Sequence, residues 1–157
     1  MSLGKKHWAI AEGWIPSWSH GPKPEMLSHE TACILNPNDT EAHLEITIFY
    51  SDRNPVGPYK ITVPARRTLH QRFNDLEDPE PIPKATNYAS TIDSDVPIVV
   101  QHTRLDSRQT ENALITTAEV LQIGPGSQLD DILLYAPFAG VHIHSGTVWT
   151  NTDIIAK

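Results

Sequence analysis

The sequence predicts an all-β protein, an antiparallel sandwich or barrel of about eight short strands. Apolar and polar residues alternate over short segments, most clearly in residues 41–52, where Leu44, Ile46 and Ile48 share one face. The 157-residue chain also contains 13 prolines spread along its length, which suits short strands and tight turns better than long helices. We find no amphipathic helical pattern that would compete with this interpretation.

The expected strands follow one another at short intervals. They are residues 7–16, 28–39, 41–52, 59–65, 66–76, 88–95, 97–107 and 111–123. Loops are expected at residues 18–26, 53–58 and 77–87, because each contains two or three prolines. The Asn-Pro-Asn-Asp turn that begins at Asn36 ends the second strand. Many short strands separated by turns are typical of an antiparallel sandwich or barrel.

The chain divides into two parts. We expect residues 1–120 to form the β-sandwich domain and residues 121–157 to be a C-terminal extension, because the segment GPGSQ at 124–128 interrupts the pattern. The extension contains apolar pieces that could form an extra hairpin with residues 139–140 near its turn. They could also form a tail that packs only on a partner.

Composition limits the classes of function. A formal net charge of −7 argues against non-specific binding of nucleic acid. Cys33 is the one cysteine, so no internal disulfide is possible and a reducing compartment fits best. No apolar run approaches the roughly 20 residues that a membrane span requires. We therefore expect a soluble, cytoplasmic protein.

A row of ionisable residues follows the apolar run Ile98–Val100. His102, Arg104, Asp106 and Arg108 occupy every second position, so they share one face if the strand continues. The row could be a solvated face whose cross-strand pairs contribute only about 0.2–1 kcal/mol each. We favour a polar pocket or a subunit interface, because the polar stretch directly follows the apolar run and arginine pairs bidentately with carboxylates.

Residues near the N-terminus are further candidates for ligand binding. Trp14 and Trp18 flank loops, where an indole face can stack on a sugar ring. Glu12, His29 and Glu30 are residue types that act as acids and bases. An enzyme would also need a nucleophile held by a base and an orienting group. The sequence supplies no such set, so we expect ligand contacts or exposed strand positions and no catalysis.

A basic segment precedes an acidic one. Arg66, Arg67 and Arg72 are followed by Asn74 and by Asp75, where an acidic run begins. In an oligomer, the basic segment of one protomer could meet the acidic loop of the next. Such a contact would determine how the protomers align more than how tightly they bind. The alternative is that both segments are solvated.

Eight histidines raise the question of a metal site. His142 and His144 would share one face of a strand, but two ligands do not make a zinc site. The other histidines are scattered along the chain. We therefore expect neither a metal nor a cofactor.

Five long blocks of the sequence are rich in uncommon residues: AEGWIP, SHETACILNPND, HLEITIFYSDRNPVGPYKITVPARRT, RFNDLEDPEPIP and VPIVVQHTRLDSRQ. In these blocks, over roughly residues 7–118, the chain resembles the sensory rhodopsin transducer family. The resemblance implies a β-sandwich protomer of jelly-roll type and a four-fold homotetramer. It also implies that the protein relays the state of a membrane photoreceptor, a sensory rhodopsin, and that its sandwich is similar to carbohydrate-binding modules.

Three hypotheses for function remain. The leading one is a non-enzymatic signalling protein of this family that acts as a homotetramer. The second is a module that binds carbohydrates or small molecules without any rhodopsin partner. The third and least favoured is an enzyme that uses Glu12, His29 and His102, which would require these three side chains to lie close together.

Overall fold

The structure, a computed structural model, describes residues 3–108, 113–118, 142–144 and 147–149. These residues form strands joined by loops, with one 3-10 turn, η1 (Phe73–Asp75), and none of them forms a helix that could cross a membrane. The strands are β1 (Lys5–Trp14), β2 (His29–Asn36), β3 (Ala42–Tyr50), β4 (Val56–Val63), β5 (Arg67–Arg72), β6 (Asn87–Asp106), β7 (Ala113–Ala118), β8 (His142–His144) and β9 (Thr147–Trp149). Every pairing between them is antiparallel, which confirms the predicted fold class.

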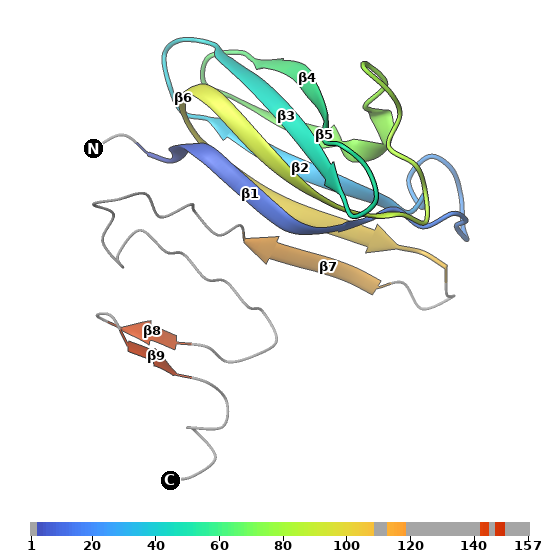
Figure 1. Cartoon of the computed structure of the whole chain (residues 1–157). Helices are drawn as coiled ribbons and strands as arrows, with labels where there is room; N and C mark the ends of the chain where they lie inside the picture. The colour runs from blue at the N-terminus through green and yellow to red at the C-terminus, as the bar shows by residue number, and fades with distance from the viewer. Residues whose placement is uncertain (1–2, 109–112, 119–141, 145–146, 150–157) are drawn as a thin grey trace, which may run out of the picture.

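Strand β6 is long enough to take part in two sheets (Figure 1). Its first half pairs with β1 on one side and with β3 on the other, and β4 adds to β3. Its second half pairs with β7 and β2, and β5 adds to β2. We call β1–β6–β3–β4 sheet A and β7–β6–β2–β5 sheet B.

The prediction of two separate strands at residues 88–95 and 97–107 is wrong, because β6 runs unbroken through both. The pairs with β3 end at Ser94 and those with β2 begin at Val99. Pro97 therefore lies where the strand changes partner, and there its missing N–H is tolerated. The side-chain amide of Asn38 donates to the Pro97 carbonyl at 2.7 Å and holds this point in place.

The fifth strand is shorter than the predicted residues 66–76. Strand β5 ends at Arg72, and the next three residues form η1. The physical reason is burial: Phe73 is only 1% exposed, so the chain turns inward to place this ring in the core.

The hydrophobic core is one cluster to which both sheets contribute. Residues at even-numbered positions of β2, β3 and β6 face inward, as shown by the buried side chains of Ile34, Ile46 and Ile92. Burial of each such side chain stabilises the fold by about 1.5–3 kcal/mol. The same inward face of β6 continues through Val100 to His102, so the charged row begins where the core ends.

Strands β8 and β9 pair with each other, with Ile143 opposite Val148. The turn expected at residues 139–140 lies outside the described residues. The boundary at residue 120 and the role of residues 121–157 stay predictions.

Candidate functional site

The charged row begins on the inward face of β6, which carries His102, Arg104 and Asp106, and Arg108 follows just beyond the end of the strand. His102 is 4% exposed, and the side chain of Arg104 is 13% exposed. Asp106 and Arg108 lie progressively nearer to solvent. This follows from the alternation of side chains along a strand, because His102 and Arg104 have the same parity as the buried Ile98 and Val100.

The centre of the site is Glu30, whose side chain is 1% exposed. It lies directly opposite Arg104 in the β2–β6 register, so the two side chains point to the same face. Arg104 Nε donates to Glu30 Oε1 at 2.6 Å, and a second guanidinium nitrogen also contacts this oxygen. The backbone N–H of Trp14 donates to the same oxygen at 2.7 Å. The Tyr88 hydroxyl donates to Oε2 at 2.5 Å, and His102 Nε2 lies 3.6 Å from it.

These neighbours determine the charge state of Glu30. Burial alone would raise the pKa of this carboxyl, but His102, Tyr88, the Trp14 amide and the positive charge of Arg104 together lower the pKa to about 2. Burial and the negative charge of Glu30 raise the pKa of Tyr88, so its hydroxyl stays a donor. Burial lowers the pKa of Arg104, yet its carboxylate partners reverse this and raise it.

The site reaches the surface through Glu12 and Arg108. Arg104 Nη1 lies 2.5 Å from Glu12 Oε1, and the Glu12 side chain is 70% exposed. Arg108 donates through Nε and Nη2 to the Asp106 carboxylate, which lowers the pKa of Asp106. The Arg108 guanidinium lies over the Trp14 ring, 4.5 Å from its centroid. A chain of charges thus runs from the buried Glu30 to solvent.

Asn74 supports the site from η1. Its side-chain oxygen accepts from the Glu30 backbone N–H at 3.3 Å, and its side-chain nitrogen donates to the Ser28 carbonyl at 3.1 Å. The sequence indicated Asn74 only as a neighbour of the acidic run. In the structure it fixes the backbone that carries Glu30.

Two candidates near the N-terminus, Trp18 and His29, lie away from this network. Trp18 is 52% exposed in the loop after β1, with its ring edge-on to His20. His29 accompanies Leu105 on the other face of sheet B, since its neighbour Glu30 points inward. The set Glu12, His29 and His102 therefore does not converge, and the geometric condition for the enzyme hypothesis is not met.

The basic and acidic segments are also separate from the site. Arg66, in the turn between β4 and β5, pairs with Asp39, which lies in the turn between β2 and β3 of the same chain. Arg67 donates to the Arg66 carbonyl at 2.9 Å. Asp75 is exposed at the end of η1. Whether these segments meet another protomer stays a prediction.

The sequence missed Tyr88 and Phe73. The Phe73 ring lies between two members of the site, with ring centroids 5.9 Å from Tyr88 and 6.3 Å from His102. One signal was present in the sequence: Gly13 interrupts the first strand, and such a glycine often marks a close approach. In the structure Gly13 lies opposite Tyr88, and a Cβ there would overlap the tyrosine ring.

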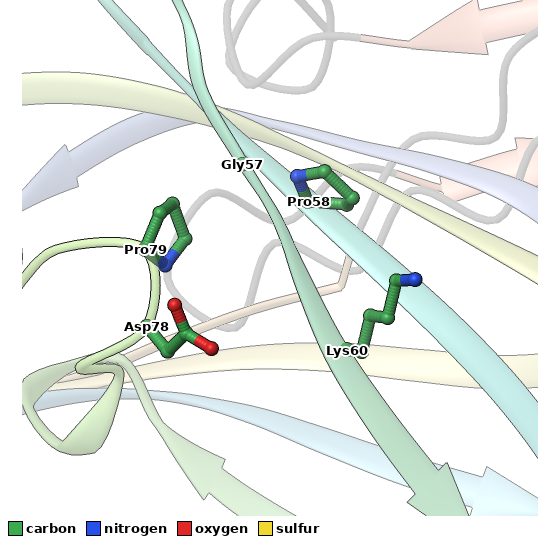
Figure 2. Close-up of a pocket in the computed structure, with 5 residues that line it drawn as sticks. All are labelled: Gly57, Pro58, Lys60, Asp78 and Pro79. Atoms are coloured by element: carbon green, nitrogen blue, oxygen red, sulfur yellow. The ribbon is translucent and has the colours of Figure 1, made fainter.

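A separate cavity of about 430 Å³ lies beside β4 (Figure 2). It is lined by Gly57, Pro58, Lys60, Asp78 and Pro79, all of them exposed. Figure 2 shows β4 passing beside the loop that carries Asp78 and Pro79. No member of the Glu30 network lines this cavity, so we keep the network as the candidate site.

The arrangement is suited to binding and to fixed electrostatics. The lowered pKa of Glu30 and the raised pKa values of Tyr88 and Arg104 keep Glu30 ionised, Tyr88 protonated and Arg104 charged around neutral pH, so these three groups hold constant charges. In the part of the chain that the structure describes, no three His, Cys, Asp or Glu side chains are grouped so that they could hold a metal ion.

The fold and the site define an all-β protein with two antiparallel sheets that share one strand and with a buried charged network at one end. The family model described as Anabaena sensory rhodopsin transducer matches residues 3–120. The chain therefore belongs to this family, and the resemblance seen in the sequence blocks is confirmed.

Two solved structures show the same relationship. The structure of the Anabaena sensory rhodopsin transducer is 65% identical in sequence, with a TM-score of 0.60, and the match covers 66% of this chain and 99% of that chain. The crystal structure of Thermotoga maritima 1070 is 31% identical, with a TM-score of 0.69, and the match covers 77% of this chain and 97% of that chain. The search of curated proteins found no match.

Proposed function

We propose that this chain is a soluble, cytoplasmic, non-enzymatic signalling protein that binds a membrane photoreceptor of the sensory rhodopsin class and relays its state. The observation that carries the proposal is the 65% identity to the Anabaena sensory rhodopsin transducer over 99% of that chain. To relay a state, the protein must bind the dark and illuminated receptor with different affinities, because a ligand shifts an equilibrium only through such a difference.

The direct test is binding to purified Anabaena sensory rhodopsin in detergent. We expect binding by isothermal titration calorimetry, with a dissociation constant that differs between darkness and continuous illumination. A light-driven proton pump in the same detergent is the control for non-specific adsorption. Absence of binding in both states would reject the receptor part of the proposal.

We further propose that the protein acts as a homotetramer. A symmetric oligomer presents repeated copies of one surface, so that weak contacts to a receptor add by avidity. Light scattering at micromolar concentration should give a mass near four chains. A stable monomer under these conditions would contradict the assembly and weaken the transducer proposal.

A second candidate function is binding of a carbohydrate or small molecule without a rhodopsin. It is favoured by the surface end of the site, where the Glu12 carboxylate and the Arg108 guanidinium are accessible to solvent and could bind a polar ligand. A ligand bound there would raise the melting temperature in a thermal-shift screen of sugars and small acids. No shift across a broad panel would count against this function.

A further inference from the structure

The cavity beside β4 lies where this strand carries one more residue than its partner. Ile46 of β3 pairs with Tyr59 and Ile48 pairs with Val56, so the segment Gly57–Pro58 of β4 lies opposite a single residue of β3. Both residues of this β-bulge line the cavity. A bulge bends its strand and changes the direction of the side chains, and it tolerates a proline that has no N–H to donate.

Glycine is needed at one position of the bulge. Gly57 has a φ of +148°, which residues with a side chain rarely adopt. A Cβ at this position would lie 2.7 Å from the Ile46 carbonyl oxygen. The backbone of β4 therefore lies close against β3, and this wall of the cavity has little room to move.

The loop on the other side of the cavity is also fixed. Leu76 and Ile82, near its two ends, are buried in the core. Between them, the Tyr59 hydroxyl donates to the Glu80 carbonyl at 2.7 Å, and burial raises the pKa of Tyr59 to about 12, so that it stays a donor. The lining segment Asp78–Pro79 is thus held beside β4 (Figure 2). Walls that are ordered before binding reduce the entropy that a ligand must overcome.

The cavity lining carries one charge of each sign. Lys60 and Asp78 are both exposed, and no ion pair among the described residues includes either of them. Figure 2 shows the Asp78 carboxylate directed from the loop towards β4, whereas Lys60 extends from β4 on the side of Pro58. A ligand with a single charge would meet one attractive and one repulsive group. A ligand with both charges is attracted by both groups, so the lining favours a zwitterion.

The remaining lining is largely apolar. Pro58 and Pro79 contribute saturated rings from the two sides of the cavity. Their rigid rings provide contact area without loss of side-chain freedom. The volume of about 430 Å³ lies within the range of small-molecule sites. A charged pair separated by apolar surface in a space of this size matches a compact zwitterion with an apolar part.

We propose that this cavity binds a small zwitterion, either a free amino acid or a short peptide. Asp78 contacts the ammonium group of the ligand and Lys60 contacts its carboxylate, while the two proline rings contact its apolar part. The inference goes beyond the proposed signalling function, because it needs no receptor and uses no residue of the Glu30 network.

The test begins with a thermal-shift screen of the full chain against the standard amino acids and the dipeptide alanyl-leucine. A ligand of the folded state raises the melting temperature, so at least one of these zwitterions should do so. Isothermal titration calorimetry then compares that zwitterion with its N-acetyl and amide derivatives, which lack the ammonium charge and the carboxylate, respectively. Each derivative should bind about tenfold more weakly, because it loses a hydrogen bond between charged groups.

Variants assign the two ends of the ligand. Lys60→Met and Asp78→Asn should each weaken binding of the zwitterion about tenfold. Lys60→Met should also remove the preference for the zwitterion over its amide, and Asp78→Asn the preference over its N-acetyl derivative. Lys84→Met and Glu77→Gln are matched controls, since they remove the same charges at exposed positions that do not line the cavity. Both controls should bind as the unmodified protein does, and circular dichroism checks that all four variants are folded.

Three results would overturn the inference. The first is a screen in which no zwitterion raises the melting temperature. The second is a zwitterion that binds Lys60→Met and Asp78→Asn as tightly as the unmodified protein, because it then binds elsewhere. The third is equal affinity of the unmodified protein for the zwitterion and both derivatives, and this comparison does not depend on the folding of any variant.

Discussion

Glu30 is a carboxylate kept ionised inside the protein by opposing effects. Desolvation favours its neutral form, whereas His102, the Tyr88 hydroxyl, the Trp14 amide and the Arg104 guanidinium together favour the charged form more strongly. The same balance makes the network sensitive to the loss of one member, because a remaining buried charge then has no partner.

Glu30→Gln should therefore destabilise the fold strongly. We expect a loss of about 3–5 kcal/mol in the free energy of unfolding, since Arg104 loses its buried counter-charge. Urea unfolding followed by tryptophan fluorescence measures it. The control is Glu12→Gln, which removes the exposed partner of the same arginine and should cost no more than about 1 kcal/mol. Equal losses for the two variants would show that burial does not distinguish the two pairs.

The lowered pKa of Glu30 predicts acid sensitivity. A folded-state pKa of about 2, below the ordinary value of 4.5, contributes stability that is present above pH 4.5 and is lost as pH falls towards 2. The contribution at neutral pH is about 3 kcal/mol. Urea midpoints measured from pH 7 to pH 2 should fall over this window, and less steeply in Glu30→Gln. If the urea midpoints of the unmodified protein and of Glu30→Gln fell in parallel with pH, the acid sensitivity would not come from Glu30.

Tyr88→Phe tests the hydroxyl that the sequence did not reveal. Removing a donor to a buried carboxylate should cost about 1.5–3 kcal/mol. It should also raise the pKa of Glu30, so that stability begins to fall at a higher pH than in the unmodified protein. Tyr59→Phe is a comparison in another region, since its hydroxyl donates to the Glu80 carbonyl and not to a charged group. An unchanged pH profile in Tyr88→Phe would argue that this hydrogen bond is not made in solution.

At the scale of elements, the sequence predicted strands well and their pairing poorly. The alternation in residues 41–52 identified β3, and the apolar run at Ile98–Val100 identified the second half of β6. The sequence did not reveal that Glu30 faces Arg104, because the register between β2 and β6 depends on contacts between residues 74 positions apart. For the same reason the charged row was visible, but its inward orientation was not.

Gly13→Ala tests the approach of β1 to β6. A methyl group at this position would overlap the Tyr88 ring, which is held between Phe73 and Glu30 and has little room to move. We expect a loss of about 1–3 kcal/mol, the usual cost of forced overpacking. Urea unfolding measures it, and Ala11→Gly, at an exposed position of the same strand, is the control. A Gly13→Ala protein as stable as the unmodified one would mean that the tyrosine ring moves aside freely.

At the scale of the whole molecule, the pattern of residues predicted the fold, whereas the family resemblance predicted the function. Alternation and turn residues predicted an all-β antiparallel protein without reference to any relative. They did not predict a receptor, because the site consists of groups that balance one another's charge within the chain. The signalling role comes from similarity over residues 3–120 and is to be tested by binding.

Sheets A and B end at Ala118, the last residue of β7, close to the end of the family match at residue 120. A chain shortened to residues 1–120 should therefore fold with the melting temperature of the full chain within a few degrees, because it retains all seven strands of sheets A and B and the Glu30 network. Differential scanning calorimetry measures this. Light scattering on the same sample tests whether residues 121–157 contribute to association, and we expect the mass to remain near four chains because the family match ends at residue 120. A large fall in melting temperature would show that the extension packs on the sheets, and a fall in mass at unchanged melting temperature would place part of the contact between copies beyond residue 120.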